Sequence, residues 1–280
     1  MKHTVAAVQM VSTPDVDENL AAAERLISEA ATANAEFVLL PEVFAVLEGG
    51  PMHRHGEIEG SGKIQEFLAD QAKTHNLILA GGTIPLLSRP NTTSSDGDHL
   101  VDNDRVRPAC LVYDKNGQQI ARYDKMHLFD VKVADKQASY SESRSYEPGD
   151  EIVSLPTAVG HLGISVCYDL RFPELYREFF KRGVEIVTVP AAFTAVTGEA
   201  HWETLLRARA IENQCYVVAA AQGGKHNEKR ETWGHSMIID PWGTVLDRVE
   251  KGEGVAIAEI DLEFLNKLRQ RMPISDQLRL

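Results

Sequence analysis

Short apolar runs alternate along the chain with stretches in which apolar positions recur every three or four residues. The first pattern is typical of buried β-strands and the second of helices with one buried face. Strands are predicted at 4–10, 36–40, 77–84, 108–113, 118–123, 160–167, 185–190, 215–222, 235–240, 244–249 and 255–260. Helices are predicted from 15 to about 34, from 61 to about 75, and at 173–182, 199–213 and 263–271. This alternation favours a layered α/β fold.

Cap and turn residues support several of these boundaries. Asp15 with Glu18 resembles a capping box at the start of the first helix, and Ser61 is a candidate N-cap of the second. Asn116-Gly117 between two apolar runs predicts a hairpin with a type I′ turn. Such hairpins argue against a purely parallel sheet, and therefore against a Rossmann fold or a TIM barrel. The sequence also contains no G-x-G-x-x-G and no Walker A motif, so nucleotide binding has no support.

The chain shows no linker-like boundary and no repeat of solenoid period, which indicates a single domain over 1–280. The polar segment 88–105 is predicted to be a mobile insert loop. The longest apolar run, 215–221, is too short to cross a membrane as a helix. The N-terminus lacks the charged-then-apolar layout of a signal peptide.

Composition narrows the class of protein. Of the 280 residues, 43% are hydrophobic and 25% charged, which is typical of a soluble globular domain and excludes disorder of the whole chain. The net charge of -12 disfavours nucleic acids and anionic membranes as partners, because both require positive charge on the protein. Three scattered cysteines are too few for a disulfide framework and indicate a reducing, cytoplasmic compartment.

Three polar residues that directly follow three different apolar strands are the candidates for catalysis. Cys167 stands between a strand and a helix that opens at Pro173, so backbone N–H groups lie free near its thiol. Glu42 and Lys125 each follow another strand. Strand ends at one edge of a sheet are where α/β proteins build their sites. Taken singly, Cys167 is as compatible with a buried packing residue as with a nucleophile, whereas Glu42 and Lys125 are each typical of surface charges.

Other chemically active residues give weaker signals. Cys110 and Cys215 lie inside apolar strands and are assigned to packing. His53 and His55 have no further ligands near them in sequence, so no metal site is predicted. The charged segment 223–231 is interpreted as a solvated hairpin tip or, alternatively, as the border of an active-site mouth.

In their order and spacing, the three candidate segments resemble the nitrilase, or carbon–nitrogen hydrolase, superfamily. The resemblance extends from Val5 to about Asp261. It implies an α/β fold that is a four-layer α-β-β-α sandwich of the nitrilase type with two mixed sheets. It also implies a homodimer or a higher homo-oligomer.

The Glu-Lys-Cys triad of that superfamily corresponds to Glu42, Lys125 and Cys167, and a second family glutamate corresponds to Glu142. The resemblance implies a thiol amidohydrolase that needs neither a cofactor nor a metal. In this chemistry the Cys167 thiolate attacks a small carboxylate-bearing amide and forms a thioester. Lys125 and the backbone N–H of Tyr168 would face the oxyanion.

The residues around the triad resemble one branch of the superfamily. Tyr168-Asp169 follows the cysteine where nitrile-hydrolysing members have Trp-Glu, which favours amide substrates. The stretches 201–212, 216–222 and 234–243 resemble the Nit1-type branch, whose members act on deaminated glutathione as metabolite-repair enzymes. The sister Nit2 type is ω-amidase, which acts on α-ketoglutaramate and is the second candidate activity. The sequence is also compatible with capture of the thioester by an amine, and with a scaffold that binds a partner without catalysis.

A carboxylate-bearing amide requires basic or hydrogen-bonding groups in the pocket. The candidates are Arg171, Phe193, Thr194 and Thr197. Alternatively, Arg171 pairs with Glu174, and the two threonines cap the helix that follows them.

Overall fold

The computed structural model describes residues 1–48, 50–90 and 100–279, and within them the strands form two large sheets and one small one. The first sheet has seven strands in the order β15-β1-β2-β3-β5-β4, with β6 paired to β5. Its strands are β1 (Lys2–Gln9), β2 (Phe37–Leu39), β3 (Ile78–Ala80), β4 (Ile84–Leu86), β5 (Arg107–Tyr113), β6 (Gln119–Asp124) and β15 (Gly254–Asp261). The strands β1, β2 and β3 run parallel, whereas β15 and β5 pair antiparallel with β1 and β3.

The second sheet has six strands in the order β14-β13-β12-β11-β10-β9. They are β9 (Ser154–Thr157), β10 (Gly160–Ile164), β11 (Ile186–Ala191), β12 (Tyr216–Ala221), β13 (Met237–Ile239) and β14 (Val245–Arg248). The central strands β10, β11 and β12 are parallel and the outer ones antiparallel, so both large sheets are mixed, as predicted. A separate small hairpin joins β7 (Asp130–Lys132) and β8 (Ser139–Ser141).

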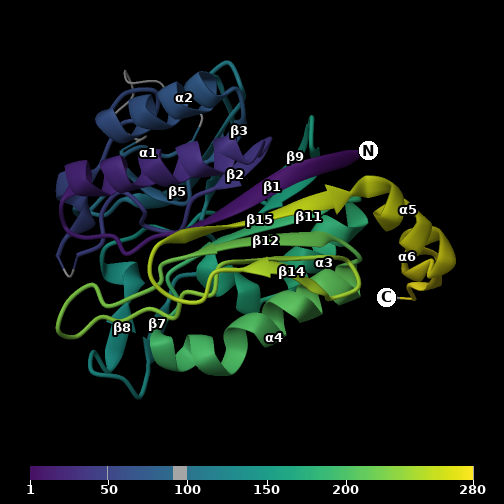
Figure 1. Ribbon diagram of the computed structural model, residues 1–280. Helices are drawn as coiled ribbons and strands as arrows, with labels where there is room; N and C mark the ends of the chain where they lie inside the picture. Colours follow the sequence, from purple (N-terminus) through teal and green to yellow (C-terminus); the bar gives the residue numbers. More distant parts are fainter. Residues whose placement is uncertain (49, 91–99, 280) are drawn as a thin grey trace.

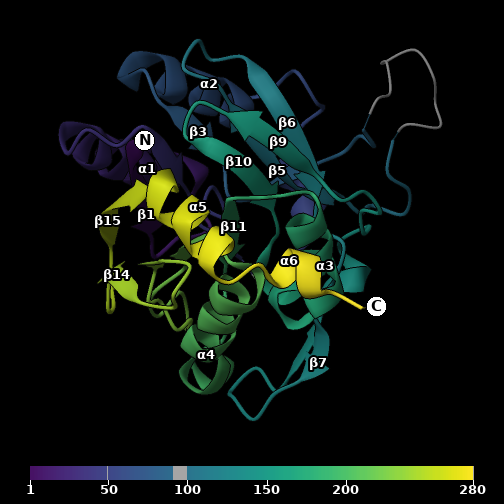
Figure 2. The ribbon, with the colours of Figure 1, turned by 90° about the vertical axis from the view of Figure 1, so that its right-hand side faces the viewer.

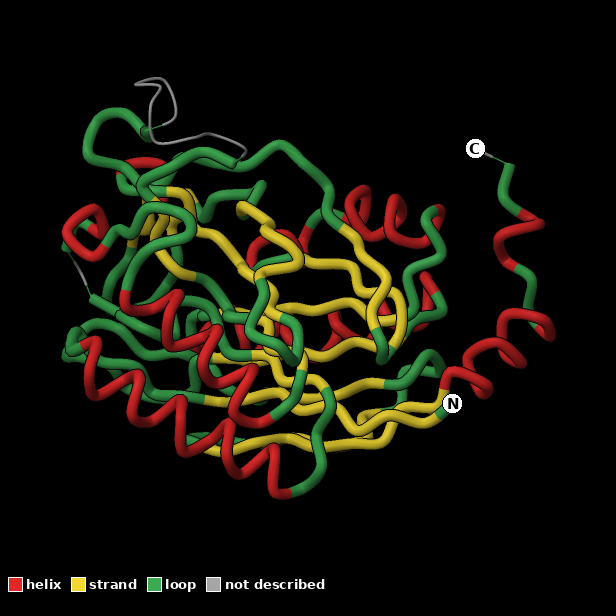
Figure 3. Tube along the Cα trace, turned by 90° about the horizontal axis from the view of Figure 1, so that it is seen from above, coloured by secondary structure: helices red, strands yellow, loops and turns green. Residues whose placement is uncertain are grey.

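Helices cover the outer faces of both sheets, which gives four layers (Figure 1). The helices α1 (Val16–Thr32) and α2 (Lys63–His75) lie side by side over the first sheet (Figure 3). The helices α3 (Pro173–Lys181) and α4 (Ala195–Asn213) cover the second sheet, and α5 (Leu262–Arg271) and α6 (Ile274–Gln277) cross one end of the molecule (Figure 2). The predicted α-β-β-α sandwich is confirmed.

The period-two alternation of side chains along β1 explains how the first sheet serves two cores. Val5 and Ala7 belong to the core between the two sheets, whereas Ala6 and Val8 belong to the core beneath α1 and α2. All four are fully buried, so this strand is apolar on both faces.

The helix starts differ from the predicted caps in two places. The carboxylate of Asp15 accepts from the backbone N–H groups of Asp17 and Glu18 and caps α1 as predicted, but the Glu18 side chain accepts from Thr13 rather than completing a capping box. The prediction for Ser61 is wrong. Gly62 is the N-cap of α2, and the first turn donates instead to the carboxylate of Glu57.

The hairpin between β5 and β6 exists, but its turn is not type I′. That turn requires positive φ at both central residues. Only Gly117 has positive φ here, at 77°, and the register shifts at Val112/Tyr113. An extra residue in the loop therefore gives a turn followed by a left-handed glycine rather than a two-residue turn.

Other differences concern short or polar segments. The single strand predicted at 77–84 is split into β3 and β4, and α4 begins at Ala195 because Thr194 caps it. The polar strands β7, β8 and β9 were not predicted. Within the predicted insert 88–105, residues 91–99 lie outside the described residues, while Ser88 and Leu100 bridge its base. In the described ranges, no helix is long and apolar enough to cross a membrane.

Candidate active site

The carboxyl ends of parallel strands from both sheets meet at one end of the sandwich. Glu42 follows β2, and Lys125 follows β6, both in the first sheet. Cys167 follows β10 in the second sheet and opens the short helix η4 (Cys167–Arg171). Glu142 opens η3 (Glu142–Arg144), directly after β8. The expectation that strand ends would gather these residues at one edge therefore agrees with their placement.

The backbone around Glu42 is fixed on both sides. Its carbonyl oxygen accepts a hydrogen bond from Gln222 Nε2 at 3.1 Å, which joins the ends of β2 and β12. The next residue, Val43, has φ of 51°, and its N–H donates to Thr83 Oγ1 at 2.8 Å. A β-branched residue in the left-handed region is strained, so the surrounding contacts must hold this turn in place.

Gly82 makes that turn possible. Its φ is 54°, and an ideal Cβ at this position would lie 1.9 Å from the carbonyl oxygen of Pro41. Only glycine allows the loop after β3 to approach the backbone that carries Glu42 so closely.

Lys125 is fully buried between two carboxylates. Its ammonium donates to Glu42 Oε1 at 2.8 Å and to Glu142 Oε2 at 2.7 Å. Burial by itself would lower the pKa of Lys125, but Glu142 and Glu42 outweigh it and raise this pKa well above its usual range. The lysine is therefore charged at neutral pH.

Glu142 is itself held by the loop after β6. Its Oε2 also accepts from the backbone N–H of Phe129 at 2.8 Å. Burial raises the pKa of the Glu142 carboxyl, Lys125 lowers it and Glu42 raises it, and the balance lies above the usual value. The arrangement is two carboxylates that share one ammonium.

Cys167 has φ of 48°, an uncommon conformation for a residue other than glycine. Burial raises the pKa of its thiol well above the usual range, and Glu42 raises it further. Lys125 and a backbone hydrogen bond with Ala192 act in the opposite direction but do not prevail. The resting sulfur is therefore a thiol, and a base must remove its proton before it can attack.

Asp169 fixes the turn that presents Cys167. It is fully buried, and its Oδ2 accepts from the Val166 N–H at 2.8 Å and the Tyr123 hydroxyl at 2.6 Å. Its Oδ1 accepts from the backbone N–H of His127 at 3.1 Å and lies 2.7 Å from the His127 ring nitrogen Nδ1. One carboxylate thus joins the segments on both sides of Lys125 to the residue before the cysteine.

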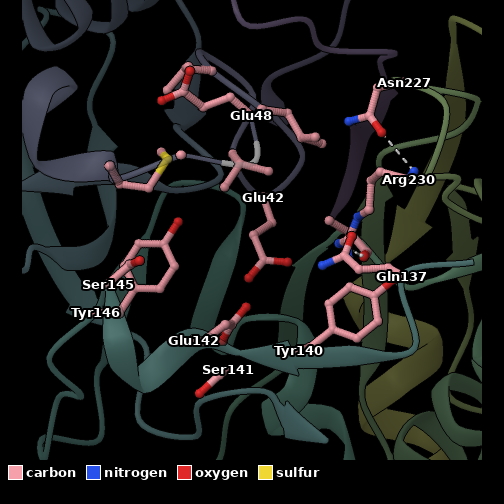
Figure 4. Close-up of a pocket in the computed structure, with 16 residues that line it drawn as sticks. Glu42, Glu48, Gln137, Tyr140, Ser141, Glu142, Ser145, Tyr146, Asn227 and Arg230 are labelled. Atoms are coloured by element: carbon pink, nitrogen blue, oxygen red, sulfur yellow. Dashed lines mark hydrogen bonds between the residues drawn. The ribbon is translucent and has the colours of Figure 1, made fainter. Parts of the chain in front are cut away.

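Two adjoining cavities open at this edge. The smaller, of about 20 Å³, is lined by Cys167 and by Phe129, Tyr168, Phe193, Thr194 and Thr197, among others. The larger, of about 250 Å³, is more polar, and Figure 4 shows Glu42, Glu142, Tyr140 and Arg230 around it. Glu42, Glu142, Ala192 and Arg230 line both cavities.

Three of the four predicted substrate contacts line the small cavity, and Arg171 does not. Phe193, Thr194 and Thr197 line the small cavity, and Thr194 also caps α4 by accepting from the Thr197 N–H. Arg171 lines neither cavity. Its guanidinium lies 5.3 Å from the centre of the Phe193 ring and 5.8 Å from that of Tyr168, and Arg171 forms no ion pair with Glu174, although both residues are described.

Arg230 is the site residue that the sequence did not single out. It lies on the charged segment 223–231, for which an active-site border was only one of two interpretations. Polar hairpin tips usually face water, and nothing in the local pattern indicates which of the cations in this segment turns inward. In the described part of the chain, no group of three or more His, Cys, Asp or Glu side chains is arranged to hold a metal ion.

The chain is similar to known proteins over nearly its whole length. The family model described as "Carbon-nitrogen hydrolase" matches residues 4–270. The deaminated glutathione amidase of Synechocystis sp. is 42% identical over 97% of this chain and 96% of the relative.

Two solved structures are similar over nearly the whole chain. Nit3 from Saccharomyces cerevisiae, described as a member of branch 10 of the nitrilase superfamily, has a TM-score of 0.86 at 30% identity and covers 100% of this chain and 97% of its own. The Caenorhabditis elegans NitFhit protein has a TM-score of 0.84 at 38% identity; the match covers 99% of this chain and 65% of that longer one. This chain therefore belongs to the carbon–nitrogen hydrolase family.

Proposed function

We propose that the protein is an amidase that hydrolyses deaminated glutathione through a thioester on Cys167. The observation that carries the chemistry is the buried Lys125 ammonium between Glu42 and Glu142, in a site whose small cavity is also lined by Cys167. The substrate follows from similarity to the Synechocystis amidase, because 42% identity over almost the full length supports a shared substrate.

In the first step Glu42 takes the thiol proton of Cys167, and the sulfur attacks the amide carbonyl carbon. The Lys125 ammonium and the Tyr168 backbone N–H stabilise the oxyanion of the tetrahedral intermediate. The C–N bond then breaks, and protonated Glu42 gives its proton to the departing amine, cysteinylglycine. The oxoglutaryl group remains on the sulfur.

In the second step Glu42 removes a proton from water, which attacks the thioester carbonyl. The C–S bond breaks, 2-oxoglutarate leaves, and the thiol recovers its proton from Glu42. Glu142 keeps a negative charge beside Lys125 while Glu42 is protonated. This constant counter-ion explains why two glutamates surround one lysine.

We further propose that the chain is one domain over 1–280 and forms a homodimer or a higher homo-oligomer in the cytoplasm. The match to one family model over 4–270 supports the single domain. Exposed apolar side chains on α4 and near β14, among them Ile211, Trp242 and Leu246, support association. The three cysteines are all free and buried, which agrees with a reducing compartment.

The test compares two substrates side by side. Cysteinylglycine release from deaminated glutathione and ammonia release from α-ketoglutaramate are measured for the wild type and for Cys167→Ala. Higher kcat/KM for deaminated glutathione, lost in the variant, supports the proposal. Preference for α-ketoglutaramate would keep the chemistry and assign ω-amidase activity. Turnover that survives in Cys167→Ala would refute the thioester, and inactivity of the wild type on both amides would refute the proposed substrate.

A further inference from the structure

Arg230 occupies a distinctive place between the two cavities. In the described residues it is the one cationic side chain that lines either cavity, and it lines both. The other charged groups of the larger cavity are the carboxylates Glu42, Glu48 and Glu142. Of the charged side chains that line this space, Arg230 is therefore the one that attracts an anion, while the three carboxylates repel it.

The guanidinium is fixed in position but has no acidic partner in the part of the chain that the structure describes. Its Nη2 donates to the carbonyl oxygen of Ala192 at 2.9 Å, and its central carbon lies 4.8 Å from the centre of the Tyr140 ring. Figure 4 shows the side chain extending over that ring toward Glu42. Among the described residues, no carboxylate lies within 4.0 Å of it, whereas Arg89, Arg107 and Arg122 all form ion pairs. Most of its five N–H donors are thus available to a ligand.

The segment that carries Arg230 is anchored to the body of the protein. The His226 Nδ1–H donates to the carbonyl oxygen of Ser12 at 2.8 Å, and Nε2 forms a hydrogen bond with the Thr232 hydroxyl at 2.7 Å. The Asn227 side chain accepts from the backbone N–H groups of Lys229 and Arg230, both at 2.9 Å. A cation on an anchored hairpin loses little conformational freedom when it binds a ligand.

We propose that Arg230 is a specificity-determining residue that binds a carboxylate of the substrate while the scissile amide lies in the small cavity beside Cys167. The inference rests on the proposed function and names the group that selects its substrate. A cavity of about 20 Å³ holds little more than one water-sized group, so only the reacting end of the substrate reaches it and the rest extends into the larger cavity past Arg230. A planar guanidinium fits a carboxylate with two parallel hydrogen bonds.

Deaminated glutathione offers two carboxylates, one on the oxoglutaryl side and one on the glycine of the leaving dipeptide. The test therefore uses Arg230→Gln and Arg230→Lys, with Lys229→Gln as the matched control. Lys229 is the preceding residue, is exposed, lines neither cavity, and its substitution removes the same charge. Substrates are deaminated glutathione, its C-terminal carboxamide and α-ketoglutaramate.

For Arg230→Gln, KM for deaminated glutathione is expected to rise about 10- to 100-fold, the range for loss of a charge-assisted hydrogen bond, while kcat changes less than threefold. Arg230→Lys should recover part of the loss, and Lys229→Gln should behave as the wild type. If Arg230 binds the oxoglutaryl carboxylate, the KM for α-ketoglutaramate rises by the same factor. If it binds the glycine carboxylate, only the KM for deaminated glutathione rises, and the wild type already has a high KM for the C-terminal carboxamide. A KM within twofold of the wild type on all three amides would overturn the proposal.

A binding measurement separates this proposal from the proposed function. Calorimetry on Cys167→Ala, with and without Arg230→Gln, gives the affinity for the two carboxylate-bearing products, 2-oxoglutarate and cysteinylglycine, without turnover. A tenfold or greater loss for one of them supports the carboxylate site even if the wild type does not hydrolyse deaminated glutathione. Equal affinities with and without Arg230 refute the site even if hydrolysis is fast.

Discussion

Asp169→Asn tests whether one buried carboxylate supports both the stability of the fold and the placement of Cys167. The native side chain, which is fully buried, has four hydrogen-bond partners: the Val166 N–H, the Tyr123 hydroxyl, and the backbone and ring nitrogens of His127. Asparagine has one acceptor oxygen and a donor NH₂ in place of the second. Two of the four partners therefore lose their acceptor.

The expected cost follows from those contacts. Hydrogen bonds to a charged acceptor contribute about 1.5–3 kcal/mol each, and a buried donor left unpaired costs about 1–3 kcal/mol. We expect the free energy of unfolding to fall by at least about 3 kcal/mol. Because the Val166 N–H is one of the tethered groups, the backbone before the cysteine should also shift. A displacement near 1 Å at a reacting group costs on the order of 100-fold in kcat.

Urea unfolding followed by circular dichroism measures the first quantity, and kcat at a temperature where the variant is folded measures the second. Tyr123→Phe is the matched control because it removes one of the donors and leaves the acceptor intact. It should cost about 1–2 kcal/mol and leave kcat nearly unchanged. A free energy of unfolding for Asp169→Asn within 0.5 kcal/mol of wild type (about the scatter of a surface substitution), or a cost for Tyr123→Phe equal to it, would refute the reasoning.

Three further substitutions probe the site from other sides. Lys125→Arg should lower kcat by at least about 100-fold in a folded protein, because a forked guanidinium cannot replace a compact ammonium between two carboxylates; wild-type turnover would contradict this. Gly82→Ala should lower the free energy of unfolding by about 3 kcal/mol or more, because its Cβ would overlap the carbonyl oxygen of Pro41. The control Gly183→Ala, at φ 73° with open space around it, should lower it by about 1 kcal/mol. Equal urea midpoints for the two variants would refute this contrast. Burial lowers the pKa of His226 to about 4, below its unfolded value of about 6.5. Between these two pH values the unfolded chain binds more protons than the folded one. The neutral His226 therefore contributes to the free energy of unfolding fully above pH 6.5, and this contribution is lost as pH falls toward 4. Between pH 7 and 5, the free energy of unfolding measured by urea titration should therefore fall by about 2 kcal/mol less for His226→Gln than for the wild type. Equal falls for the two proteins would show that His226 is not responsible.

The layered fold was accessible from sequence because it depends on local patterns. Buried parallel strands such as β11 and β12 are continuous apolar runs, and α3 has proline in its first turn and glycine after its end. The short polar strands β7 and β8 carry no such signal. They exist because they pair with each other at the rim of the cavity. The cap of α2 was missed for a similar reason, since Glu57 reaches it from outside the helix.

The sequence predicts those site residues that directly follow strands and that match the family in order and spacing. The contacts of Glu42, Lys125 and Glu142 agree with the predicted set, while their catalytic roles stay a proposal. Arg230 could not be found this way. Whether a hairpin cation turns inward is decided by tertiary contacts, here the Ala192 carbonyl and the Tyr140 ring. The direction of a long side chain has no periodic signature in sequence.

The pairing of β15 with β1 means that the first sheet cannot be completed until the end of the chain has been made. The register runs from Lys2↔Asp261 to Gln9↔Gly254, so nearly the whole polypeptide separates the partners. Pairings this remote in sequence slow folding, because a long loop must close before the contacts form. Until β15 has been synthesised, β1 presents an unpaired apolar edge to other chains. A chain interrupted after β14 would contain every residue of the active site and still be prone to aggregate. The final strand, far from the chemistry, thus determines whether a newly made molecule reaches its soluble form.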